Sequence, residues 1–173
     1  MLGKIILNLA MSIDGYIANN DGSFDWINGD GCSDLNTEFK SDFNLFLESI
    51  DVVLMGSDCY KQEMANLFPT KAVYVATNEN KEDHDNIHFI QGDLVSIMHK
   101  LQKEGLNIYL FGGGKVIDPF IKANCIDEYM IGIIPILLGT GRRLFLDHNP
   151  TIELSLKKYS IEDGVTVLHF HKR

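Results

Sequence analysis

The segment NIYLFGGGKVIDPF, residues 107–120, contains the pattern on which the fold prediction rests. Its first five residues form a mostly apolar run typical of a buried strand, and residues 116–123 have the character of a helix. Between them lie Gly112, Gly113 and Gly114. Open α/β sheets bind ligands beyond the carboxyl ends of their strands, so this strand end is a candidate ligand site.

The helix after the glycines has two alternative starting points. Asp118 and Pro119 form a good cap and first-turn pair, so the helix could begin there and leave the glycines in a longer loop. It could also begin at Gly114 and lose one hydrogen bond at Pro119. A phosphate site favours the second alternative, because the free N–H groups of the first turn then face the anion.

Strands and helices alternate on both sides of this segment. Further buried strands are predicted at residues 4–9, 52–55, 71–76, 87–90 and 128–134, and helices at 57–67 and 94–101. Residues 19–34 are rich in Gly, Asn, Asp and Ser and are expected to form a loop. A longer helix is predicted from a cap at Ser33 along an apolar stripe of Leu35, Phe39, Phe43, Phe46 and Ile50.

The last part of the chain predicts an antiparallel hairpin. Residues 151–159 and 165–171 alternate in polarity and are joined across the turn sequence Glu162-Asp163-Gly164. With the alternating strands and helices before it, the hairpin predicts an α/β domain whose sheet is mostly parallel, with an antiparallel edge. No linker or repeat divides residues 1–173, so a single domain is expected.

Composition limits the function classes. The formal net charge of -9 disfavours nucleic acid as a partner. No apolar stretch reaches membrane-spanning length, and residues 1–10 lack the pattern of a signal peptide, so a cytoplasmic protein is expected. The three cysteines, Cys32, Cys59 and Cys125, are widely spaced, which predicts neither a disulfide framework nor a metal site.

The glycine segment does not fit the two best-known phosphate motifs. Val116 follows Lys115 where a P-loop requires Ser or Thr, and Ile117 stands where the dinucleotide fingerprint has its last glycine. A tight turn without a ligand is the alternative. Three successive glycines cost backbone entropy, and this cost favours a phosphate site over that alternative.

The motifs together resemble the dihydrofolate reductase-like proteins, and in particular the reductase domain of riboflavin biosynthesis. They occur in the expected order over nearly the whole chain. They are the segments at residues 12–18 (SIDGYIA), 53–56 (VLMG) followed by Tyr60, 111–116 (FGGGKV), 126–128 (IDE) and 134–145 (IPILLGTGRRLF).

The resemblance implies a dihydrofolate reductase-like fold with three layers, α/β/α, and NADPH as the hydride donor. It implies the following cofactor residues: Ala10, Ile17 and Ala18 beside the nicotinamide ring; Gly56, Ser57 and Cys59 from the second motif; Thr77 and Asn78 near the adenosine; and Gly112, Gly113, Gly114, Lys115 and Val116 at the diphosphate.

The second motif departs from the family pattern, which reads Gly-Arg-x-Thr-Tyr. This chain has Ser57 in place of the arginine that favours a 2′-phosphate, Asp58 adds a negative charge, and Cys59 replaces a hydroxyl. One of Lys71, Lys81 or Lys115 would then have to bind the 2′-phosphate, and NADH stays an alternative cofactor.

The proton donor and the substrate contacts are predicted from the helix expected after Ser33. On that helix Asp42 lies at the edge of the apolar stripe, with Glu38 beside it, so either acid is a candidate catalytic group. The alternative for each is a solvated helix flank. Trp26 is a candidate substrate contact, because the resemblance implies that the corresponding tryptophan of the family lines the substrate pocket. The alternative is that Trp26 only packs against neighbouring residues.

Two further groups of residues could bind an ion, but an ordinary position on the surface is the simpler interpretation of each. His169 and His171 share a strand face and could bind a metal, but no third ligand is evident. Arg142 and Arg143 could form an anion site or a subunit contact, with surface solvation as the default.

The sequence predicts an NADPH-dependent oxidoreductase that reduces a pterin, a folate or a ribityl-aminopyrimidine precursor of riboflavin. The partner would be this small-molecule substrate, and the family resemblance implies a homodimer. The alternative is a non-catalytic nucleotide-binding or sensing module on the same fold.

Overall fold

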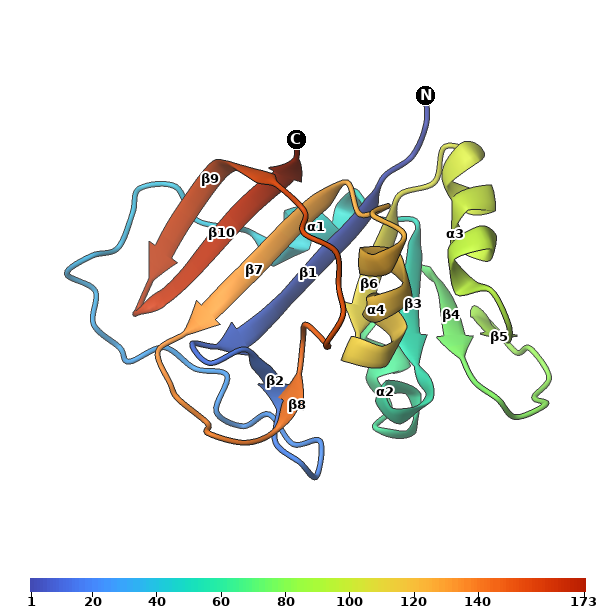
Figure 1. The fold of residues 1–173 in the computed structure, drawn as a ribbon, viewed down its shortest axis with the longest axis horizontal. Coiled ribbons are helices and arrows are strands. Elements are labelled where there is room, and N and C mark those ends of the chain that lie inside the picture. The colour runs from blue at the N-terminus through green and yellow to red at the C-terminus, as the bar shows by residue number, and fades with distance from the viewer.

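The computed structural model describes residues 1–173 and is built on one eight-stranded sheet (Figure 1). The strand order is β5-β4-β3-β6-β1-β7-β10-β9, and β2 and β8 form a separate pair. The strands are β1 Ile5–Ser12, β2 Tyr16–Ala18, β3 Val52–Gly56, β4 Ala72–Ala76, β5 Ile87–Ile90, β6 Ile108–Gly112, β7 Glu128–Ile134, β8 Arg142–Arg143, β9 Leu154–Glu162 and β10 Val165–Lys172.

The sheet is parallel except at the edge formed by the C-terminal hairpin. Strand β1 pairs in parallel with β6 and β7, while β10 pairs antiparallel with both β7 and β9. Asp163 and Gly164 form the hairpin turn with φ values of 49° and 86°, as expected of a two-residue turn that follows the twist of the strands. The mostly parallel sheet and the hairpin are therefore confirmed.

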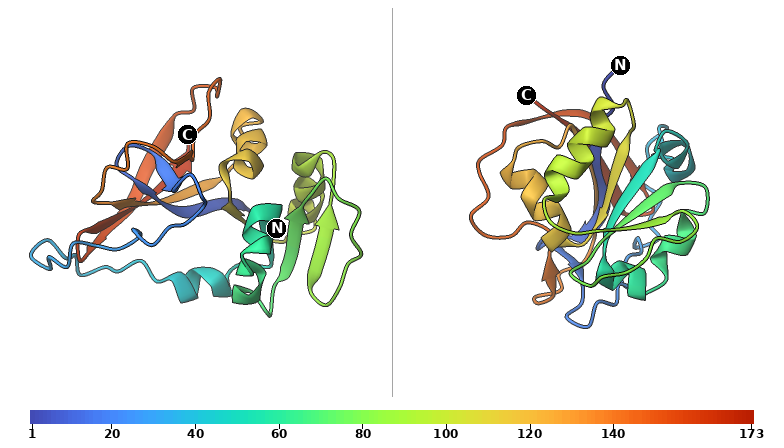
Figure 2. Two further views of the ribbon diagram at one scale, coloured as in Figure 1. Left: turned by 90° about the horizontal axis from the view of Figure 1, so that it is seen from below. Right: turned by 90° about the vertical axis from the view of Figure 1, so that its right-hand side faces the viewer.

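The helices cover both faces of the sheet and make three layers (Figure 2). They are α1 Phe43–Glu48, α2 Ser57–Lys61, the 3₁₀ helix η1 Met64–Leu67, α3 Leu94–Lys103 and α4 Gly114–Lys122. Alternation along β3 sends Leu54 toward α3 and α4, and Val53 and Met55 toward α1 and η1. None of these helices combines the length and apolarity that crossing a membrane requires.

The helix expected from Ser33 to Ile50 is wrong in its first half. Residues before Phe43 are not helical, and Leu35 is 73% exposed. Thr37 instead binds the hairpin edge, because its N–H donates to the Ile161 carbonyl at 3.0 Å and its Oγ1 accepts from the Ile161 N–H at 2.9 Å. This pairing replaces the helical hydrogen bonds, so the helical apolar stripe exists only from Phe43 onward.

Two other differences are local. The helix expected over residues 57–67 is broken at Glu63, which adopts a φ of 60°, so it becomes α2 and η1. The short strands β2 and β8, which pair with each other, lie in segments with no strand-like periodicity. Each strand forms its hydrogen bonds with a segment more than 120 residues away in the sequence. Local sequence patterns cannot predict such a pairing.

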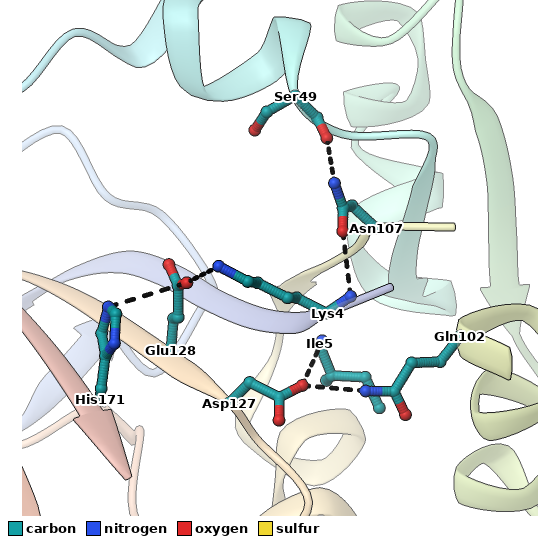
Figure 3. Close-up of polar contacts among 8 residues, drawn as sticks. All are labelled: Lys4, Ile5, Ser49, Gln102, Asn107, Asp127, Glu128 and His171. Carbon is teal, nitrogen blue, oxygen red and sulfur yellow. Dashed lines mark hydrogen bonds and ion pairs between the residues drawn. The ribbon is translucent and has the colours of Figure 1, made fainter. Parts of the chain in front are cut away.

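Hydrogen bonds from side chains connect the amino-terminal ends of the parallel strands (Figure 3). Asp127 Oδ2 accepts from the Ile5 N–H and from the Gln102 side-chain amide, both at 2.9 Å. Asn107 bridges the Lys4 N–H and the Ser49 carbonyl. These bonds join β1, β6, β7, α1 and α3 at the end of the sheet that lies opposite the carboxyl ends of its parallel strands.

We expect Asp127→Ala to lower the free energy of unfolding by about 1–3 kcal/mol, because the Ile5 N–H and the Gln102 amide lose their shared acceptor. Urea denaturation measures this loss. Asp127→Asn keeps an acceptor oxygen and serves as the matched control, with a smaller loss. Equal stabilities for the alanine variant and the wild type would contradict the role given to Asp127.

Candidate functional site

A cleft of about 1760 Å³ opens at the carboxyl ends of the parallel strands. In Figure 1 these ends point to the lower edge of the molecule, where α2, β2 and β8 also lie. The cleft walls are contributed by β1, β3, β6, β7 and β10, by the first residues of α2 and α4, and by the loop that contains residues 22–29. The site therefore lies where an open α/β sheet is expected to bind its ligand.

The glycine bend between β6 and α4 forms part of the cleft wall. Gly112 has a φ of 145°, the Gly112–Gly113 peptide bond is cis, and Gly113 is the N-cap of α4. Helix α4 begins at Gly114 and contains Pro119, so the second alternative for its start is confirmed. The Gly114 and Lys115 amides belong to the first turn, where N–H groups have no intrahelical partner.

The surroundings of Gly113 and Gly114 differ. A Cβ on Gly114 would lie 2.5 Å from the Arg143 carbonyl oxygen, so β8 can pass α4 only beside a glycine. A Cβ on Gly113 would meet no protein atom within 4 Å, although this residue lines the cleft. Gly113 is therefore not needed for packing, and its open side faces the cleft.

The first motif holds the loops around the cleft together. The Asp14 carboxylate accepts from the Ser12 hydroxyl at 2.6 Å and from the N–H groups of Leu138 and Gly139 at 3.1 and 2.7 Å. The hydrogen bond from Ser12 is the main cause that lowers the pKa of Asp14. Asp14 thus joins the 12–18 motif to the 134–145 motif.

The second motif carries an ion pair and a neutral thiol. Arg142 Nη1 lies 3.2 Å from Asp58 Oδ2, so an arginine from β8 pairs with the acid of the second motif. Burial raises the pKa of the Cys59 thiol, and the charge of Asp58 adds to this increase. Cys59 therefore stays protonated near pH 7 and can donate only a weak hydrogen bond.

Residues beyond β4 complete the cleft on one side. Thr77 is buried, its Oγ1 accepts from the Glu79 N–H at 3.1 Å, and both Thr77 and Asn78 line the cleft. Of the three lysines proposed to bind a 2′-phosphate, only Lys115 lines the cleft. Lys81 pairs with Glu79 at 3.1 Å, and Lys71 precedes β4, at the opposite end of the sheet.

Every cofactor residue that the family resemblance implies lies along this one cleft. The set comprises Ala10, Ile17, Ala18, Gly56, Ser57, Cys59, Thr77, Asn78, Gly112, Gly113, Gly114, Lys115 and Val116. Sequence reasoning placed them on five separate segments, and the sheet order brings these segments to one edge.

The candidate acids do not join this group. Asp42 is the N-cap of α1, where its Oδ1 accepts from the Asn44 and Leu45 N–H groups at 2.8 and 3.1 Å. Glu38 is exposed in a non-helical segment, and neither acid lines the cleft. The helical-wheel argument that paired the two acids is wrong, because the helix begins only at Phe43.

Trp26 lies between cleft residues without lining the cleft itself. Its neighbours Asp25 and Ile27 are lining residues, while its own indole Nε1 is buried without a hydrogen-bond partner. The structure thus places Trp26 in the loop that borders the site.

Several residues that line the cleft were not predicted from the sequence, or were assigned to the solvated surface. Arg142 and Arg143 line the cleft, although surface solvation was the default for them. Asn8, Ser41 and Glu162 also line it, and they come from β1, from the segment before α1 and from the hairpin turn. The pairing of β8 with β2 decides where the arginines lie, and no local pattern reveals this pairing.

The histidines of β10 have protein partners. His169 Nε2 lies 3.1 Å from the Ser41 hydroxyl oxygen, and His171 Nε2 lies 3.7 Å from Glu128 Oε1. Burial is the main cause that lowers the pKa of His169. No three His, Cys, Asp or Glu side chains gather in a way that could hold a metal ion.

Comparison with known proteins identifies relatives along the whole chain. The family model for the RibD C-terminal domain matches residues 3–68 and 59–169. The uncharacterized protein YwjB of Bacillus subtilis (strain 168) is 32% identical over 173 residues, which cover 96% of this chain and 97% of YwjB.

Solved structures share the same fold. A Shewanella sp. PV-4 protein assigned to riboflavin biosynthesis is 29% identical with a TM-score of 0.78, covering 100% of this chain and 99% of that one. Dihydrofolate reductase from Enterococcus faecalis, solved with NADP(H), is 13% identical with a TM-score of 0.71, covering 100% and 98%. The Thermotoga maritima deaminase and 5-amino-6-(5-phosphoribosylamino)uracil reductase is 16% identical with a TM-score of 0.71, covering 99% and 57%. These matches confirm the expected dihydrofolate reductase-like fold.

We predict that alanine lowers the free energy of unfolding much more at Gly114 than at the neighbouring Gly113. Gly114→Ala forces α4 and β8 apart and should cost about 1–3 kcal/mol, because its Cβ would lie 2.5 Å from the Arg143 carbonyl oxygen. Gly113→Ala meets open space and should stay within about 1 kcal/mol of the wild type. Thermal and urea denaturation of both variants measure the difference. A Gly113 variant less stable than the Gly114 variant would contradict the steric account.

Proposed function

This chain belongs to the RibD C-terminal domain family, and from that premise we propose that it is a nicotinamide-dependent reductase of a pterin, a folate or a riboflavin-precursor heterocycle. NADPH is the proposed hydride donor and NADH the alternative. The observation that carries the proposal is that all the implied cofactor residues line one cleft at the carboxyl end of the sheet.

The backbone at the glycine bend fits the diphosphate of such a cofactor. Gly113 leaves open space on the cleft side, and the Gly114 and Lys115 amides begin helix α4. The positive end of the helix dipole and unpaired N–H groups bind phosphate in many proteins. In a protein of net charge -9, such a local positive site is required for a dianionic group.

Small residues on β1 and β7 suit the flat nicotinamide ring. Gly132 lies opposite Ala10 in the strand register, and a Cβ on Gly132 would already meet the Ala10 Cβ at 3.5 Å. Ile17 and Ala18 border the same part of the cleft. When bound there, the reduced nicotinamide supplies a hydride to the substrate, and the surrounding residues hold the two rings together and exclude water.

Arg142 is the proposed functional replacement for the arginine missing from the second motif. It lies between Asp58 and the loop at Gly22, where a Cβ would meet its guanidinium at 3.2 Å. Its neighbour Arg143 passes beside Gly114 at the start of α4. An exposed ion pair contributes about 0–1 kcal/mol, so the guanidinium can exchange Asp58 for a phosphate oxygen at little cost.

A non-catalytic binding module is the second candidate, and one observation favours it. The acids expected to donate a proton, Glu38 and Asp42, do not line the cleft. A module of this kind would bind the nicotinamide cofactor through the same residues without turnover of any heterocycle. Turnover assays with dihydropterins and aminopyrimidines separate the two candidates.

Titration with NADPH tests the proposal, with energy transfer from Trp26, the single tryptophan, as the signal. We expect saturable binding by the wild type. Gly113→Val should weaken binding at least about tenfold, because its side chain occupies the diphosphate position and a hydrogen bond to a charged group contributes about 1.5–3 kcal/mol. A folded wild type that binds neither NADPH nor NADH would refute the proposal.

The Arg142–Asp58 pair gives a second test in which two variants should act in opposite directions. Arg142→Met removes a phosphate contact and should weaken NADPH binding by roughly five- to tenfold. Asp58→Asn removes a repelling charge and releases the guanidinium, so it should strengthen binding by roughly two- to fivefold. Isothermal titration calorimetry measures both. If the pair were only structural, both variants would break it alike and change the affinity in the same direction.

A further inference from the structure

The charges that line the cleft are divided between its two ends. Its only cationic residues are Lys115, Arg142 and Arg143. Lys115 and Arg143 lie at the glycine bend, and Arg142 precedes Arg143 in β8 and pairs with Asp58, the one acid that lines the cleft beside these cations. Lys115 is in the first turn of α4, and the Arg143 carbonyl oxygen lies against Gly114. No Lys, Arg or His lines the remainder of the cleft.

The end away from the glycine bend is acidic. Glu162 and Asp163, at the turn of the β9–β10 hairpin, line it, and Asp25 lines the loop that leads toward it. This loop lies directly on the hairpin turn, because a Cβ on Gly29 would clash with the Asp163 carbonyl oxygen. The acids therefore belong to one surface and not to separate walls.

The lysines nearest to this acidic end are already engaged outside the cleft. Lys40 Nζ pairs with Glu162 Oε1 at 2.9 Å, and Lys158 Nζ lies 5.2 Å from the centroid of the Phe39 ring. Neither lysine lines the cleft. Lys40 balances the charge of Glu162 alone, so an anionic group placed here would still meet Asp25 and Asp163 without a cation lining this end of the cleft.

The surface between the two ends is apolar and aromatic, with a few polar groups. Phe43, Tyr109 and Phe111 line it, together with the amide of Asn8 and the hydroxyl of Ser41. Flat faces with sparse hydrogen-bonding groups suit a planar heterocycle. This part of the cleft therefore supplies ring contacts but no anion recognition.

We propose that the reducible substrate is a planar heterocycle without a phosphate or carboxylate group, an inference that rests on the proposed function. The three cations pair with the phosphates of the cofactor, and the carboxylates at the acidic end repel an anionic group on the substrate. The substrate class therefore differs from the phosphoribosyl compound named for the Thermotoga maritima relative. It also excludes a folate with its glutamate tail, and leaves simple pterins and unphosphorylated aminopyrimidines.

Matched ligand pairs test this substrate class on the NADPH-saturated protein. The pairs are 7,8-dihydrobiopterin against 7,8-dihydrofolate, and a ribosylaminouracil against its 5′-phosphate. We expect the uncharged member of each pair to bind at least tenfold more tightly by calorimetry at low ionic strength. Added salt should narrow the gap, because it screens exposed charges.

A variant at the acidic end should change the preference in a predictable direction. Glu162→Gln removes a carboxylate and releases Lys40, so the affinity of the anionic members should rise several-fold relative to that of the uncharged members, which narrows the gap within each pair. Glu153→Gln is the matched control, because Glu153 is an exposed acid paired with Arg173 outside the cleft. It should change neither affinity.

The outcomes distinguish this inference from the function on which it rests. Equal or tighter binding of the anionic members, or no binding of any uncharged member to the NADPH complex, overturns the substrate class and leaves the cofactor assignment standing. Failure of NADPH itself to bind the wild type overturns the proposed function instead.

Discussion

The close approach of β8 to the bend between β6 and α4 is the constraint on which the site depends. Gly112 turns the chain with a φ of 145°, Gly114 lets β8 pass at contact distance, and Gly113 leaves its open side to the cleft. A side chain at the first position would strain the backbone, and one at the second would push β8 away. The amino end of α4 reaches the cleft because both positions are glycine.

Electrostatics follows from the same arrangement. The strand β8 carries two arginines past the start of α4, so the three cations that line the cleft lie at one end of it, while Asp25, Glu162 and Asp163 line the other. The first motif positions these arginines directly, because its strand β2 pairs with β8, and its Asp14 binds the loop that leads to β8. The family motifs thus act as one assembly and not as independent contacts.

Local sequence patterns predicted most of the sheet and the glycine bend, because each buried strand is a short apolar run and three successive glycines mark a sharp turn at a strand end. They failed where long-range hydrogen bonds decide the conformation. Thr37 pairs with Ile161 in the hairpin, so the residues before Phe43 do not form the helix that their apolar spacing favoured. The same misjudgment made Asp42 a candidate acid, although it caps α1. Asn8 was missed, and the anion site considered for Arg142 was ranked below surface solvation, because the positions of both residues depend on strand pairing and on the shape of the cleft.

The central claim is that the main-chain amides at the start of α4 bind the cofactor diphosphate. Two-dimensional ¹⁵N–¹H NMR of the labelled protein, titrated with NADPH and separately with inorganic pyrophosphate, measures this directly. The account predicts that the amide signals of Gly113, Gly114 and Lys115 shift most in both titrations. Saturable NADPH binding that leaves these three signals in place would contradict it.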